Sequence, residues 1–263
     1  MNGTARALAA GMLALAAACS QDGTNPQDVM LDRDVALFSA DAAGQDIELM
    51  RGPGGRFGMG LPAGPGNFEC DNAAPPGLTV TRTCEFYDID GQPVSAYEAG
   101  VTDRVVVHVE MSGTIDRGPW SGTVSRVRDF EVTDLADDDG TATWNGTGSG
   151  TMSRIRQTRD GGEVQMDLTS EETATDVVIP VPRRADGWPL GGTITSTVSV
   201  TFTGGPRDGE TRTRDVTITF DGTQYATVTV NGETFTIDLA NRQHAGRHRR
   251  GPGGPGDGGG QNR

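Results

Sequence analysis

The chain has 263 residues, 34% of them hydrophobic and 5% aromatic, and its formal net charge is −14 although none of its 22 basic residues is a lysine. Such a composition suits one large or two small β domains with a modest core, and argues against a large enzyme core. The negative charge argues against nucleic-acid binding through neutralisation of phosphates.

The first segment of the chain is typical of an export signal. One basic residue, Arg6, precedes an apolar run from Ala7 to Ala18. This run is too short to span a bilayer as a helix of the mature protein. We therefore expect residues 1–18 to be a signal peptide that is removed during export.

The apolar run ends in Leu15-Ala16-Ala17-Ala18-Cys19-Ser20, which resembles the lipobox of bacterial lipoprotein precursors. The resemblance implies that Cys19 becomes the lipidated first residue, that residues 19–27 form a tether and that the membrane is a partner. Ser20 after the cysteine resembles an outer-membrane sorting signal. Ala16 and Ala18 also suit ordinary signal peptidase, which would leave a soluble periplasmic or secreted protein.

The chain contains three cysteines. If Cys19 carries lipid, Cys70 and Cys84 remain as a pair in an oxidising compartment. We expect a disulfide between them that holds the proline-rich segment 73–77 against the start of a strand. Because the cysteines form no CxxC and have no neighbouring histidine, we expect no metal site here.

Residues 28–66 are expected to form a short helix, 28–50, and a Gly/Pro loop. Asn25 and Pro26 stand before the helix, and the Gly-Pro-Gly-Gly run that starts at Gly52 stops it. Gly44 could divide the helix in two.

From Leu78 to Leu239 the hydrophobic pattern has a period of two and is interrupted by turn sequences, which predicts a β domain over residues 67–241. Asn231-Gly232 is the clearest of these, since its sequence suits a two-residue hairpin. Short turns predict an all-β fold, an antiparallel meander of about nine or ten strands that forms a sandwich or a curved half-open barrel. One face of each strand is apolar and the other is rich in threonine, so one face should be buried.

Arginine occurs in spaced pairs on these strands. Residues i and i+2 of a strand point to the same face, and here each pair shares the parity of apolar residues. The candidate anion-binding residues are Arg126, Arg128, Arg154, Arg156, Arg212 and Arg214, and Arg82 follows the same pattern.

Two interpretations of these arginines stay open. They could pair with carboxylates across the sheet, as Asp167 would if a hairpin near Asp160-Gly161 placed it about opposite Arg154. Alternatively, they could form a basic strip that binds a carboxylate, phosphate or sulfated group.

Other motifs favour structural roles. Gly146, Gly148 and Gly150 are read as strand glycines that accommodate a bulge or a neighbouring tryptophan, since no helix follows them as in a phosphate loop. Trp120, Trp144 and Trp188 are expected to be core plugs, and His108 a surface residue.

The basic, Gly/Pro-rich segment 242–263 is expected to be disordered, and it could fold back on the acidic body or contact anionic lipid or polysaccharide. No nucleophile or acid–base set is evident, and no cofactor is expected. The sequence therefore favours a lipid-anchored envelope protein that acts as a noncatalytic binding or structural module. The alternative is a carbohydrate-active hydrolase whose carboxylates converge only in three dimensions.

Overall fold

A computed structural model describes residues 26–50, 70, 77–116, 121–136, 140–157, 162–180, 187–240 and 245–247. The expected signal peptide, Cys19, the whole Gly/Pro loop and most of the C-terminal segment lie outside these residues. So do Trp120 and the side chain of Arg156.

The described chain contains one α-helix, α1 (Pro26–Met50), a short 3₁₀ helix, η1 (Gly205–Arg207), and a sheet of eleven strands, two of which have only two and three residues. The strands are β1 (Leu78–Asp88), β2 (Pro93–Val94), β3 (Thr102–Asp116), β4 (Ser121–Thr133), β5 (Thr141–Gln157), β6 (Glu163–Pro180), β7 (Gly191–Thr203), β8 (Thr211–Thr219), β9 (Tyr225–Val230), β10 (Glu233–Asp238) and β11 (Ala245–Arg247). The predicted all-β meander with one N-terminal helix is confirmed.

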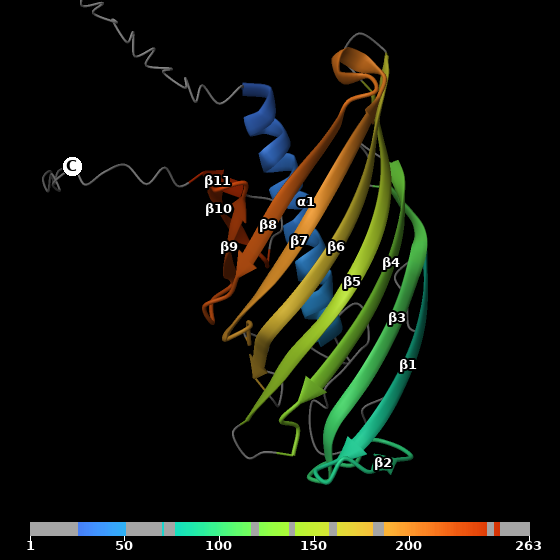
Figure 1. The fold of residues 1–263 in the computed structure, drawn as a ribbon, viewed down its shortest axis with the longest axis vertical. Helices are drawn as coiled ribbons and strands as arrows, with labels where there is room; N and C mark the ends of the chain where they lie inside the picture. Colours follow the sequence, from blue (N-terminus) through green and yellow to red (C-terminus); the bar gives the residue numbers. More distant parts are fainter. Residues whose placement is uncertain are drawn as a thin grey trace, which may run out of the picture.

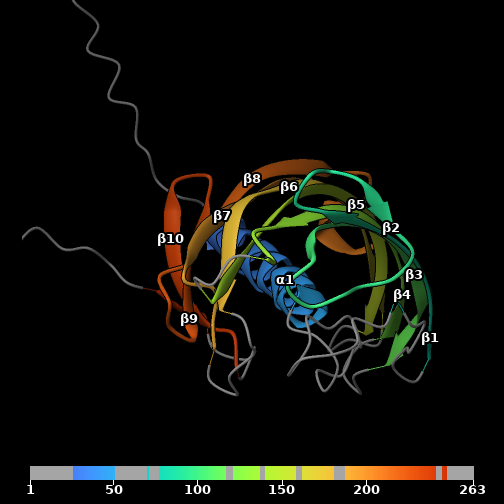
Figure 2. The same ribbon diagram turned by 90° about the horizontal axis from the view of Figure 1, so that it is seen from below.

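The sheet is a single curved layer that does not close. Its order is β11-β10-β9-β8-β7-β6-β5-β4-β3-β1-β2, and every pair of neighbours is antiparallel. The only departure from chain order is β3, which pairs with β1 on the side away from β2. Of the two architectures that the sequence left open, the structure has the curved open one, shaped like a long trough (Figures 1 and 2).

The two faces of the sheet differ as the alternation predicts. Val105, Val107 and Val109 of β3 are buried on the inner face, as are Ile194, Val198 and Val200 of β7. Threonines of β7 such as Thr195 and Thr197 are exposed on the outer face. The core therefore lies inside the curve of the sheet, and the outer face is largely hydroxyl-bearing.

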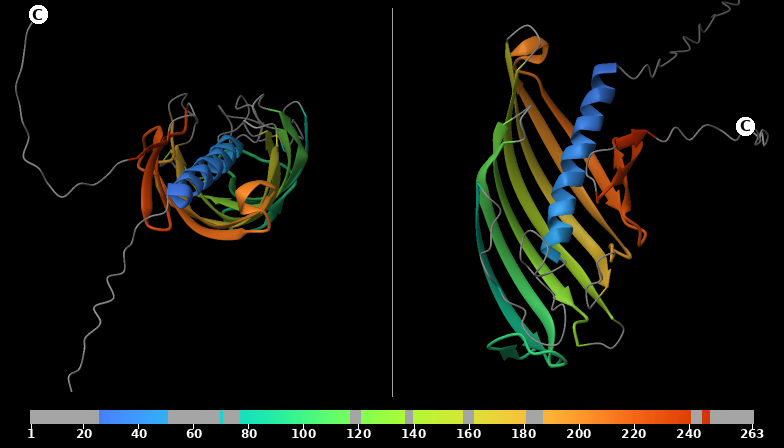
Figure 3. Two further views of the ribbon diagram at one scale, coloured as in Figure 1. Left: turned by 90° about the horizontal axis from the view of Figure 1, so that it is seen from above. Right: turned by 180° about the vertical axis from the view of Figure 1, so that it is seen from behind.

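Helix α1 lies within this curve and covers the inner face over β7 to β11 (Figures 2 and 3). Its buried core residues are Leu31, Val35, Ala36, Ala40, Ala43 and Ile47. Alanines let the helix axis approach the sheet closely, at the cost of little apolar area per residue. The helix starts two residues before the predicted Asp28 and continues past Gly44 without a break. Within the described ranges, no helix has the length and apolar character to cross a membrane.

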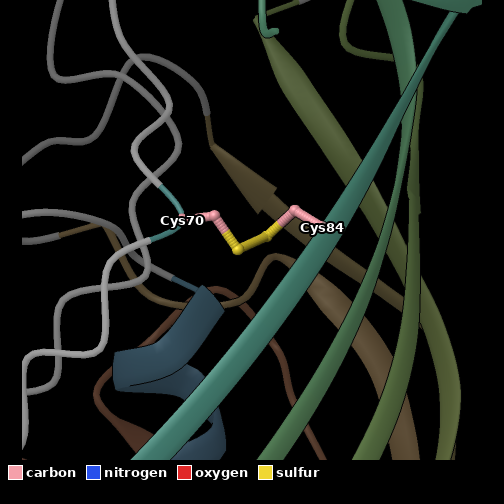
Figure 4. Close-up of a disulfide and its surroundings, with 2 residues drawn as sticks. All are labelled: Cys70 and Cys84. Atoms are coloured by element: carbon pink, nitrogen blue, oxygen red, sulfur yellow. A yellow bond between two sulfur atoms is a disulfide. The ribbon is translucent and has the colours of Figure 1, made fainter. Parts of the chain in front are cut away.

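The predicted disulfide between Cys70 and Cys84 is present (Figure 4). Cys84 lies in β1 and packs against the core, so the bond fixes the segment before β1 to a strand near the sheet edge. A pair with a sequence separation of 14 residues closes a short loop.

Replacing both cysteines with serine is expected to lower the free energy of unfolding by about 3 kcal/mol, because the unfolded chain regains the entropy of an open loop. Urea denaturation of the double variant checks this value. A reducing agent should lower the midpoint of the wild type and leave that of the variant unchanged. Equal midpoints for both oxidised proteins would contradict the prediction.

Candidate functional site

The inner face buries arginine side chains among apolar ones, as their parity predicts. Arg82, Arg126, Arg128 and Arg214 are all buried. A buried charge without a counter-charge costs several kcal/mol. The contacts of these guanidiniums therefore decide what the inner face can do.

Arg128 forms a buried ion pair inside the sheet. Its Nε lies 2.6 Å from Oε1 of Glu172, and the two side chains are 2% and 8% exposed. Its Nη1 also donates hydrogen bonds of 2.9 Å and 3.0 Å to the backbone carbonyls of Val127 and Ser149. The pair spans two strand spacings, because Gly148 lies between Arg128 and Glu172 in the register.

Gly148 makes this ion pair possible. A Cβ at this position would lie 2.5 Å from Nη1 and 2.6 Å from Cδ of Arg128. On either side, a Cβ at Gly146 would lie 2.7 Å from Cδ1 of Phe130, and one at Gly150 would lie 3.3 Å from Cγ of Arg126. The three glycines of β5 thus leave room for three side chains of β4, which are Phe130, Arg128 and Arg126 and not the neighbouring tryptophan that the sequence suggested.

The predicted bulge is also present, since the register shifts between Trp144 and Gly146. Trp144 is fully buried, and its ring packs edge to face against that of Phe130, with the ring centroids 5.7 Å apart. It fills the core, as the sequence predicts. Trp188 is partly buried against the same core.

Helix α1 supplies the contacts of two further arginines. Arg214 forms an ion pair with Asp32, and its Nη2 lies 3.5 Å from Oδ1 of Asp28. The guanidinium of Arg126 lies 5.9 Å from the ring centroid of Phe38, within cation–π range. The helix therefore brings both carboxylates and an aromatic ring to the inner face.

The remaining candidate arginines have different settings. Arg212 has a side chain that is 44% exposed, and it pairs with Glu210 next to the β7–β8 turn. Arg154 is half-buried, and its cross-strand neighbour in β6 is Met166. The expected position of Asp167 was wrong by one residue, because Asp167 pairs with Ser153 on the outer face. The five candidates whose side chains the structure describes thus occupy different environments and do not form one continuous strip.

A groove of about 610 Å³ crosses the outer face of β4 to β8. One wall consists of Asp129, Thr147, Thr173, Thr195 and Thr217, and the other of Val127, Ser149, Glu171, Thr197 and Asp215. Each wall is a row of direct cross-strand neighbours, with one residue from each strand. The sequence alternation predicted a threonine-rich face but not this groove, which depends on the alignment of five strands.

Three carboxylates lie along the groove, on alternate strands. Asp129 is in β4, Glu171 in β6 and Asp215 in β8. Glu171 and Asp215 belong to the same wall and lie two strand spacings, about 10 Å, apart, whereas Asp129 belongs to the other wall. Oδ1 of Asp215 accepts a hydrogen bond of 3.1 Å from the hydroxyl of Thr197. The groove therefore carries negative charge in both walls, among hydroxyl groups.

His108 stands beside one end of this groove, on the outer face as expected. Its Nδ1 lies 2.7 Å from Oδ1 of Asp129, and its Nε2 lies 3.5 Å from Oε1 of Glu110. The hydrogen bond to Asp129 raises the pKa of His108 above its ordinary value, and Glu110 adds to the effect.

Asp129→Asn is expected to lower the pKa of His108 toward the ordinary value, because a neutral amide no longer stabilises the imidazolium. An NMR titration of the imidazole protons measures this change. Since the folded pKa is raised, the pair stabilises the fold below the unfolded pKa, and this contribution disappears as the pH rises through the folded pKa. An unchanged His108 titration in the variant would contradict the assignment. Glu131→Gln, which alters a neighbouring outer-face carboxylate paired with Arg104, is the control.

Among the residues that the structure describes, no group of three or more His, Cys, Asp or Glu side chains could hold a metal ion.

No family model, curated protein or solved structure matches the chain.

Proposed function

We propose that the protein is a lipid-anchored, noncatalytic module of the cell envelope, held at the outer membrane through Cys19. The support for the anchor is the resemblance of residues 1–20 to lipoprotein precursors and the number of cysteines. The disulfide uses Cys70 and Cys84, which leaves Cys19 to carry the lipid. A disulfide also suits an oxidising compartment.

The observation that carries the noncatalytic interpretation is the pairing of two buried inner arginines, Arg128 and Arg214, with the protein's own carboxylates. Arg128 is paired with Glu172 of β6, and Arg214 is paired with Asp32 of α1. These contacts favour a stabilising role over an anion-binding one, because an arginine that receives a ligand anion must first give up its internal partner. The inner face then serves as a scaffold that presents the outer face.

The alternative, a carbohydrate-active hydrolase, has less support. The outer groove contains carboxylates, but the other side chains of its walls are those of threonine, serine and valine, and none is aromatic. Aromatic faces are the usual platforms for sugar rings. A shallow line of hydroxyls and carboxylates fits recognition better than hydrolysis.

The position of α1 determines how close the domain stays to the membrane. Only residues 20–25 separate Cys19 from the first residue of the helix. Six residues span at most about 20 Å when extended. A lipid on Cys19 would therefore keep the sheet next to the bilayer surface.

Cys19→Ser is expected to move the protein from the membrane fraction to the soluble periplasmic or secreted fraction, and to abolish the added mass of the lipid. Fractionation and intact-mass spectrometry of the mature protein measure both effects. The Cys70→Ser/Cys84→Ser variant is the control and should keep the lipid. If the wild type carries no lipid, or if the Cys19 variant stays in the membrane, the anchor is wrong.

A further inference from the structure

The outer groove is a narrow channel that crosses five strands. Its walls are two rows of outward side chains, which are two residues apart on each strand and therefore about 7 Å apart. The rows follow β4 to β8, so four strand spacings give a length of about 19 Å. A single unbranched chain of methylene groups fits lengthwise between the walls. A sugar ring, or a peptide backbone with its side chains, is too wide to enter.

The outer face around the groove carries only negative charge. Among the described residues of β4 to β9, no histidine occurs and every arginine has the parity of the inner face. The acidic residues Asp129, Asp167, Glu171 and Asp215 point to the outer face. A cleft lined by one sign of charge concentrates ions of the opposite sign. The groove therefore favours a cationic ligand.

Two of the groove's carboxylates have no basic partner within the described chain. Asp129 is compensated by His108, whose Nδ1 lies 2.7 Å from its Oδ1. Glu171 and Asp215 are exposed and form no ion pair there. Both belong to one wall, with Thr197 between them in the register. The hydroxyl of Thr197 donates a hydrogen bond of 3.1 Å to Oδ1 of Asp215, which leaves Oδ2 for a ligand.

The separation of these two carboxylates sets the charge spacing of the ligand. Two strand spacings place the Cα atoms of Glu171 and Asp215 about 10 Å apart. Two ammonium groups joined by an extended chain of about eight atoms lie about 11 Å apart, so they reach both carboxylates. Thr173 and Thr195 of the opposite wall offer methyl groups to the methylenes and hydroxyl oxygens to the ammonium groups.

We infer that the outer groove binds a linear polyamine, with one ammonium group at Glu171 and another at Asp215. The amine lies lengthwise in the groove, and each ion pair contributes modestly because both carboxylates are exposed. The inference goes beyond the proposed envelope function and does not depend on the lipid on Cys19. Fractionation of the Cys19→Ser variant therefore tests the anchor and not the amine site.

NMR titration of residues 19–263 carrying Cys19→Ser tests the site with four amines. Spermidine and diaminooctane have terminal amines separated by chains of equal length, octylamine has the same methylene chain with one charge, and diaminobutane is shorter. At about 20 mM salt, diaminooctane should bind about two- to fivefold more tightly than octylamine, because it forms a second ion pair. Diaminobutane should bind more weakly than diaminooctane, since it cannot reach both carboxylates. The largest amide shifts should occur at Thr195 and Thr197.

A pair of double variants separates the groove from the general charge of the outer face. Glu171→Gln/Asp215→Asn should weaken the binding of spermidine by about four- to twentyfold, because both ion pairs are lost. Glu163→Gln/Asp167→Asn is the matched control, since it removes two charges from the outer face of β6 outside the groove. It should weaken binding by less than about twofold. Thermal unfolding verifies that both variants fold like the wild type.

The amine series on the wild type decides the question even if a variant fails to fold. Equal affinities for diaminooctane and octylamine would overturn the two-carboxylate site. An equal loss of affinity in the control variant would show that the amine responds only to the charge of the outer face. Tighter binding of a Lys-Gly-Lys peptide than of spermidine would also overturn the inference, because the groove would then select a peptide.

Discussion

Replacing Glu172 with glutamine is expected to lower the free energy of unfolding by about 3–5 kcal/mol. The substitution keeps the size of the side chain and removes only its charge. Arg128, which is 2% exposed, would then remain buried beside a neutral amide. Urea denaturation with two spectroscopic probes measures the loss and verifies that unfolding remains two-state.

The neighbouring residue provides the control. Glu171 belongs to the same strand but is exposed on the outer face. Glu171→Gln should therefore change the stability by no more than about 0.5 kcal/mol. Similar losses of stability for the two variants would show that burial of Glu172 inside the curve of the sheet does not increase the cost of removing its charge.

A second comparison separates the cost of a lone charge from the value of the pair. The double variant Arg128→Met/Glu172→Leu removes both charges and fills their space with apolar atoms, and such replacements are often neutral. We expect it to be more stable than Glu172→Gln alone. If it is equally unstable, the contribution of Arg128 comes from its hydrogen bonds to the carbonyls of Val127 and Ser149.

The parity of the arginines was predictable because it is a local property. Side chains alternate along a strand, so Arg126 and Arg128 had to share a face with Val124 and Phe130. The structure buries all four of these residues. Nothing beyond one strand is needed for this prediction, and for the same reason the threonine-rich outer face was predictable.

The partners of the arginines were not predictable, because they depend on the register of several strands. Asp167 was placed opposite Arg154 by assuming a hairpin centred between Asp160 and Gly161. In the structure Gln157 pairs with Glu163, so the hairpin is centred on residue 160. A shift of one residue turns a side chain to the opposite face, and Asp167 therefore lies outside.

The position of α1 along the inner face could not be predicted from the sequence pattern either. Its start and end follow from Pro26 in the first turn and from the Gly/Pro run after Met50. Its location depends instead on the curvature of the sheet, which is the sum of twists over many strands. The acidic residues Asp28 and Asp32 acquire their role only when this curvature brings Arg214 to them.

The ion pair between Arg214 and Asp32 should contribute strongly to the stability of the fold. Asp32→Asn is expected to lower the free energy of unfolding by about 3 kcal/mol or more, because Arg214 is buried beside it. Asp28→Asn should cost less, since the side chain of Asp28 is 32% exposed and that of Asp32 only 8%.

Hydrogen exchange distinguishes loss of the helix contact from a general loss of stability. Because α1 is attached to β8 by this ion pair and by small apolar residues, the amides of α1 should exchange faster in Asp32→Asn, while those of β3 to β6 should keep most of their protection. A double-mutant cycle of Asp32→Asn and Arg214→Met should give a coupling energy above about 1 kcal/mol. Uniform acceleration over helix and sheet, together with a coupling energy near zero, would show that α1 is held to the sheet by its alanine and leucine contacts instead.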